Sequence, residues 1–188
     1  MSLLSNIPKP KIYLDANALF SAAFSERGGA RLLCRLAEFH VVKILTSPSV
    51  LSEADQALRR KAPHVLGHLA ILLDAANCQV VDDAPWAEVE SWNEIVGYGP
   101  DAGVVAAAIA AEADYLVTLD RRPSVPDGMG NKRLTQMLPL VVGTPGDCLA
   151  WLRTSLISPY DDSPNGSPAI RDHRLNEPLA AYRTRERS

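Results

Sequence analysis

Five short apolar segments alternate with helical patterns along this chain, and that alternation is what most limits its possible folds. The segments are predicted strands because they are short, apolar and bounded by turn or helix signals: Lys11–Leu14, Val41–Leu45, Gln79–Val81, Tyr115–Leu119 and Leu140–Val142. Strands joined through helices need crossover connections, which make neighbouring strands parallel. The sequence therefore predicts an α/β protein with a mainly parallel central sheet.

Amphipathic or apolar helical patterns fill the intervals between the predicted strands. They cover residues 17–24, 30–39, 48–60, 65–73, 86–96, 103–113 and 145–152. Ser47 and Pro48 form a helix-start signal, with a capping hydroxyl followed by proline at the first helical position. The 103–113 segment is apolar on nearly every face, so we expect that helix to be buried against the sheet.

The composition changes near Ser158, where turn-forming pairs such as Asn165-Gly166 replace the apolar pattern. We therefore predict one domain over residues 1–157 and a flexible or disordered tail over residues 158–188. The tail fits either a solvated terminus or an arm that binds a partner.

Charge and cysteine usage narrow the possible functions. The formal net charge is −3, so any contact with nucleic acid would need a local basic patch. Cys34, Cys78 and Cys148 are odd in number and form no C-x-x-C pair, which favours small buried side chains over disulfides or zinc ligands. The sequence shows neither a secretory signal nor an apolar run of membrane-spanning length, so we expect a cytoplasmic protein.

Acidic residues stand where predicted strands end or helices begin. Asp15 and Asp120 end the first and fourth strands, and Asp101 precedes the apolar helix. The carboxyl ends of parallel strands meet at one edge of a sheet, where ligands bind. Two carboxylates about 4 Å apart repel by roughly 4 kcal/mol at an effective dielectric near 20. The pattern therefore indicates a divalent metal ion among these acids, and with it phosphoester chemistry.

Each acid also has a purely structural interpretation. Asp15 and Asp101 could cap helices, and Asp120 could open a solvated loop. Glu53 lies past the first turn of its predicted helix, beside the apolar stripe that contains Val50 and Ala54. It could therefore lean toward the sheet or form part of a solvated flank.

The motifs taken together resemble the PIN-domain ribonucleases, and most closely the VapC-like toxins of toxin–antitoxin pairs. The resemblance rests on YLDANALFS at 13–21, SPSVLSE at 47–53, Asp101 at the head of an alanine-rich helix, and AEADYLVTLD at 111–120. It implies a Rossmann-like three-layer α/β/α sandwich and a Mg²⁺- or Mn²⁺-dependent endoribonuclease. It also implies a homodimer and an antitoxin partner protein.

The resemblance assigns roles to individual residues. The metal-binding and catalytic acids would be Asp15, Glu53, Asp101 and Asp120. The polar residues that support them would be Asn17, Ser21 and Thr118. The chain departs from many relatives at Leu119, where they have glycine, and at Arg121 and Arg122, where they have an acidic or lysine residue.

Two basic clusters have different interpretations. Arg121 and Arg122 would lie near a scissile phosphate and could bind RNA, or could belong to a solvated loop. Residues 59–61 are basic and end a predicted helix, where the macrodipole favours cations without any RNA.

Two other classes of protein stay open. One is a catalytically inactive PIN-like module that binds RNA or protein. The other is a phosphatase of the haloacid-dehalogenase type, which usually has a second acid two residues after the first, where this chain has Asn17.

Overall fold

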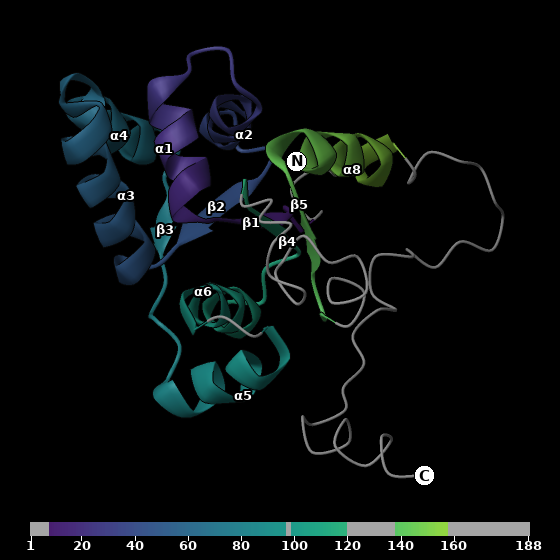
Figure 1. Ribbon diagram of the computed structural model, residues 1–188. Helices are drawn as coiled ribbons and strands as arrows, with labels where there is room; N and C mark the ends of the chain where they lie inside the picture. The colour runs from purple at the N-terminus through teal and green to yellow at the C-terminus, as the bar shows by residue number, and fades with distance from the viewer. Residues whose placement is uncertain (1–7, 97–98, 120–137, 158–188) are drawn as a thin grey trace, which may run out of the picture. The chain divides into compact units, whose positions relative to one another are not determined.

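The computed structural model describes residues 8–96, 99–119 and 138–157. Within them, five strands form one sheet in the order β3-β2-β1-β4-β5 (Figure 1). Their bounds are Lys11–Leu14 for β1, Lys43–Thr46 for β2, Gln79–Val80 for β3, Tyr115–Val117 for β4 and Val141–Gly143 for β5. Every neighbouring pair is parallel, which confirms the predicted sheet.

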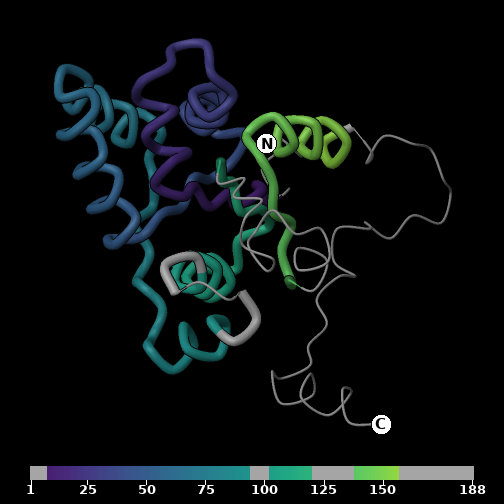
Figure 2. The backbone as a smooth tube through the Cα atoms, in the orientation of Figure 1, coloured from purple at the N-terminus to yellow at the C-terminus, as the bar shows by residue number. Residues whose placement is uncertain are grey.

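Helices connect the strands and cover both faces of the sheet (Figure 1). Their bounds are Ala16–Phe24 for α1, Gly29–Glu38 for α2, Pro48–Lys61 for α3, Leu66–Ala75 for α4, Trp86–Val96 for α5, Gly99–Ala110 for α6 and Pro145–Ile157 for α8, with a 3₁₀ turn, η2, at Pro63–Val65. The chain moves outward from β1 to β3 and then returns to β4 on the other side of β1 (Figure 2). Because such crossovers are right-handed, α5 and α6 cover the face opposite α1 to α4.

The core is built from strands whose consecutive residues are buried on both faces of the sheet, together with apolar stripes of the helices. Ile12 and Leu14 of the central strand β1 and Leu116 of the neighbouring β4 are fully buried. Ala102 and residues 105–108 of α6 are buried as well, which confirms that the alanine-rich helix is a core helix. Small side chains in α6 allow a helix to approach a sheet closely.

The predicted bounds of α6 were wrong at both ends. The helix begins at Gly99, so Asp101 lies inside its first turn and not ahead of it. It ends at Ala110, because Glu112 adopts a left-handed backbone with φ of 54°. Such a residue terminates a helix by turning the chain out of the helical path.

The Cα positions divide the chain into two compact units, residues 1–151 and 152–188. The division falls inside α8, whereas the sequence predicts a boundary after residue 157, which stays a prediction. No helix in the described part of the chain is both long enough and apolar enough to cross a bilayer.

Candidate active site

The carboxyl ends of β1 and β4 define the place where a ligand would bind. β1 pairs with β2 on one side and with β4 on the other. The direction in which successive strands are added to the sheet therefore reverses between β1 and β4. In open α/β sheets this switch point carries the ligand crevice. Asp15 follows β1 and Thr118 follows β4, and the Asp15 N–H donates to the Val117 carbonyl at 3.1 Å. The structure therefore brings these two predicted site residues together.

Asp15 is a buried carboxylate with a fixed orientation. It is only 6% exposed, and its Oδ1 accepts a hydrogen bond from the Ala18 N–H at 2.6 Å. This bond makes Asp15 the N-cap of α1, so the capping role considered from the sequence is confirmed. Capping also locks the carboxylate at the sheet edge, and a carboxylate has several acceptor positions. The cap is therefore compatible with a second role as a ligand.

Buried polar side chains gather at this edge. Among the described residues, the polar or charged side chains that are buried are Asp15, Thr46, Ser47 and Thr118. Each of them ends a strand or follows one at its carboxyl end. The Thr46 hydroxyl donates to the Leu14 carbonyl at 3.4 Å, and the Thr118 N–H donates to the Gly143 carbonyl at 3.0 Å. Burying a polar group costs free energy unless the group is hydrogen-bonded. The concentration of such groups therefore makes this edge a candidate binding site.

A hydrogen-bonded group beside β2 extends the polar edge. The Ser47 and Ser49 hydroxyl oxygens lie 3.1 Å apart, and the Ser49 hydroxyl donates to the Asp83 carboxylate at 2.6 Å. Sequence reasoning did not assign any of these three residues to the site. Asp83 could have been found, because Asp82-Asp83 follows a strand just as Asp15 does.

Tyr13 lies in β1, two residues before Asp15. Its side chain is fully buried, and burial raises the pKa of Tyr13 to about 12. The nearby Ser47 hydroxyl lowers that pKa, while the negative charges of Asp83 and Asp15 raise it. The Tyr13 hydroxyl forms no hydrogen bond of good geometry with the described residues. Tyr13 is therefore a buried side chain that is neutral at pH 7.

The other predicted site residues with described side chains lie on helices α1 and α3. Asn17 is exposed on α1, and Ser21 is half-buried one turn further along. Glu53 is exposed on α3, beside the stripe formed by the buried Val50 and Ala54. Leu119 is 38% exposed.

The side chains of the other two predicted acids, Asp101 and Asp120, lie outside the described set. The backbone of Asp101 lies in the first turn of α6, and its side chain is outside the described set. Asp120, Arg121 and Arg122 lie outside the described residues. Among the described side chains, no group of three acidic, histidine or cysteine residues is close enough to hold a metal ion. The predicted quartet as a whole stays a prediction.

The basic cluster at residues 59–61 occupies the last turn of α3, as expected for cations at a helix end. Arg59 forms an ion pair with Asp55 at 2.6 Å, and the Lys61 ammonium lies 5.9 Å from the centre of the Phe20 ring. These contacts account for two of the three cations without RNA.

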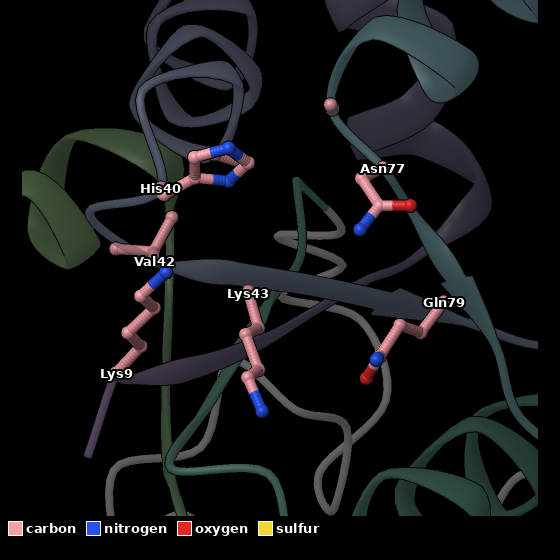
Figure 3. Close-up of a pocket in the computed structure, with 8 residues that line it drawn as sticks. Lys9, His40, Val42, Lys43, Asn77 and Gln79 are labelled. Atoms are coloured by element: carbon pink, nitrogen blue, oxygen red, sulfur yellow. The ribbon is translucent and has the colours of Figure 1, made fainter. Parts of the chain in front are cut away.

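A small hollow of about 80 Å³ lies at the opposite, amino edge of the sheet (Figure 3). His40 and Asn77 lie on one side of the β2 ribbon in Figure 3, and Lys43 and Gln79 point to the other side. His40 and Asn77 have φ of 57° and 47° and follow the ends of α2 and α4. Basic side chains are favoured beside helix C-termini. The hollow is therefore explained by helix ends and is separate from the candidate site.

A sequence model of the PIN domain matches residues 11–122 of the chain. That match spans more than half of the protein and includes β1 to β4, together with Asp15 and Thr118. The chain therefore belongs to the PIN-domain family, as the resemblance in its motifs implied.

Solved structures share the fold. The chain is similar to PAE2754 from Pyrobaculum aerophilum, with 20% identity and a TM-score of 0.52 over 77% of this chain and 96% of that one. It is also similar to VapBC2 from Rickettsia felis, which was solved bound to a DNA fragment from their promoter. That similarity has 17% identity and a TM-score of 0.50, over 71% of this chain and 98% of that one. No curated protein gave a significant match.

Proposed function

We propose that this protein is a metal-dependent endoribonuclease and the toxin of a toxin–antitoxin pair. The observation that carries the proposal is the gathering of buried polar side chains, Asp15 among them, at the switch point of a PIN-domain sheet. A sheet edge with this chemistry suits hydrolysis of a phosphodiester better than binding of an apolar ligand.

The donor groups at this edge fit a hard divalent cation. Mg²⁺ and Mn²⁺ prefer oxygen ligands, and the edge offers the Asp15 carboxylate with the Thr118 side chain beside it. We propose Asp101, Asp120 and Glu53 as the further acids that complete the site. A divalent ion held there would act as a Lewis acid toward the scissile phosphate.

The protein's own residues would orient the reaction. The Ala18 N–H holds the Asp15 carboxylate in one orientation, so little reorganisation is needed when a cation binds. Thr118, Asn17 and Ser21 would support the acids through hydrogen bonds. Arg121 and Arg122 would contact RNA phosphates, which positions the substrate without reading its sequence.

The proposed partner is an antitoxin protein, and the proposed assembly is a homodimer. The motif resemblance to VapC-like toxins supports both, and the fold shared with VapBC2 is consistent with them. Light scattering of the purified protein, alone and with the product of a neighbouring small gene, would test the assembly directly.

The test of the activity is cleavage of an end-labelled single-stranded RNA in Mn²⁺ or Mg²⁺, with and without EDTA. We expect cleavage that EDTA abolishes and excess metal restores. Asp15→Asn should lower the rate by at least about 100-fold, the upper end of what loss of a supporting metal-site group costs. Asparagine is an equally good helix cap, so α1 should be unaffected.

The matched control is Asp114→Asn. Asp114 also accepts a backbone N–H, from Lys11 at 2.8 Å, but it precedes β4 and lies at the amino edge. This variant should cleave RNA at nearly the wild-type rate. Cleavage that survives both EDTA and Asp15→Asn would contradict the proposal, and RNA binding without cleavage would favour an inactive PIN-like module.

A further inference from the structure

Helix α3 is capped from another crossover of the fold. Ser47 occupies the N-cap position, yet its side chain forms no capping hydrogen bond. Asp83, in the segment between β3 and α5, takes that role instead. Its Oδ1 accepts from the Ser49 N–H at 3.3 Å and from the Ser49 hydroxyl at 2.6 Å. The first turn of α3 is thus tied to a segment 34 residues away in the sequence.

The segment that carries Asp83 is itself tied to the sheet edge. The Val81 N–H donates to the Thr46 carbonyl at 2.8 Å, so the chain leaves β3 alongside the end of β2. Ser47, which follows Thr46, is buried and in contact with Ser49. Asp83 therefore connects the end of β2, the exit of β3 and the start of α3.

The contact places a carboxylate at the positively charged end of a helix. A helix N-terminus carries a partial positive charge, and a carboxylate is stabilised there. Burial opposes ionisation of Asp83, but the hydrogen bonds from Ser49 and Ser47 outweigh that effect and lower the pKa of the carboxyl group. Asp83 is accordingly ionised at neutral pH while it holds the helix end.

Glu53 lies one turn beyond the residue that Asp83 holds. Ser49 and Glu53 are four residues apart, so they share one face of α3. Side chains on a helix lean toward its N-terminus, so Glu53 leans over the turn that contains Ser49. A rotation or fraying of that first turn would move the Glu53 carboxylate relative to the sheet edge.

We propose that Asp83 is a positioning residue for Glu53: by clamping the first turn of α3 through Ser49, it holds the Glu53 carboxylate at the carboxyl edge of the sheet. This inference rests on the proposed ribonuclease function and on Glu53 as one of its acids. It adds to that site a residue from the β3–α5 segment.

The experiment is a double-mutant cycle on RNA cleavage, with the Mn²⁺ concentration for half-maximal rate as a second readout. Asp83→Ala should reduce cleavage by about 10- to 100-fold or raise the Mn²⁺ requirement by a similar factor. In a Glu53→Gln background, the same change should alter cleavage by less than about twofold, because Asp83 acts through Glu53. Asp83→Asn keeps an oxygen acceptor for Ser49 and should recover most of the activity.

The neighbouring Asp82→Ala serves as the control, because Asp82 is exposed and adjacent in the chain. It should cleave like the wild type. Equal losses from Asp83→Ala in both backgrounds would show a general structural role and overturn the assignment, as would full activity in Asp83→Ala or in Glu53→Gln. A wild-type protein that does not cleave RNA would remove the proposed function, and the assignment with it.

Discussion

The two edges of the same sheet treat their carboxylates differently. At the amino edge, the Lys11 ammonium lies 3.4 Å from Glu112, and Asp114 accepts the Lys11 N–H at 2.8 Å. At the carboxyl edge, Asp15 accepts from the Ala18 N–H and Asp83 from Ser49, both at helix starts. At the amino edge, one acid pairs with a lysine ammonium and the other accepts a strand N–H. At the carboxyl edge, both acids accept hydrogen bonds from the first turn of a helix.

The difference follows from the direction of the chain. In a parallel sheet, strands end and helices begin at the carboxyl edge, so α1 and α3 present N-terminal N–H groups there. At the amino edge helices end, and the partial negative charge of their C-termini favours lysines. Fixed dipoles can thus hold acids at the carboxyl edge in defined orientations, as a metal site requires. Function is expected at one edge and charge neutralisation at the other.

After Asp15→Asn, replacing the buried threonine at the carboxyl edge should have one of the largest effects on activity. Thr118→Val keeps the shape of a side chain that is 5% exposed and removes its hydroxyl. We expect RNA cleavage to fall by about 10- to 100-fold, as for other groups that orient metal ligands. Initial rates at several Mn²⁺ concentrations would measure the loss.

Thr144→Val is the matched control for that variant. The Thr144 hydroxyl donates to Asp147 at 2.7 Å at the start of α8, so its removal should affect the helix end and leave cleavage within about twofold. Equal losses in the two variants would contradict the special role of Thr118.

Acid substitutions at the two edges should rank in the opposite order for stability and for activity. Asp114→Ala removes the acceptor of the part-buried Lys11 N–H and should lower the free energy of unfolding by about 1 kcal/mol. For a chain of this size that is a fall in Tm of about 2–4 °C. Asp15→Asn preserves a capping side chain and should leave Tm nearly unchanged. Thermal unfolding without metal would compare them, and a larger loss in Asp15→Asn would show that Asp15 is mainly structural.

The smallest expected effect is a pH dependence from Asp83. Its pKa in the folded protein is lowered, so its ionisation stabilises the fold above the ordinary aspartate pKa of about 3.9. That contribution is lost as the pH falls through the folded-state pKa. The Tm difference between the wild type and Asp83→Asn should therefore shrink below about pH 4. A constant difference from pH 3 to pH 7 would contradict the hydrogen-bonded carboxylate.

The sequence was sufficient to predict the sheet and to place Asp15 and Thr118 at the same edge of it. Short apolar segments separated by helices gave the parallel sheet, and residues directly after β1 and β4 had to meet because those strands end at one edge. Glu53 could not be placed, since helical periodicity puts it beside the buried stripe without fixing its tilt. The Ser49–Asp83 contact was invisible because its partners belong to different crossovers. The end of α6 was missed because no glycine marks the left-handed Glu112.

The most direct test of this account is Mn²⁺ binding by calorimetry to the wild type, Asp15→Asn and Asp114→Asn. The account predicts that the wild type and Asp114→Asn bind Mn²⁺ with similar affinity, and that Asp15→Asn binds at least about tenfold more weakly. Equal affinity in all three proteins would show that Asp15 at the carboxyl edge does not hold the metal. That result would contradict the proposed difference in function between the two edges.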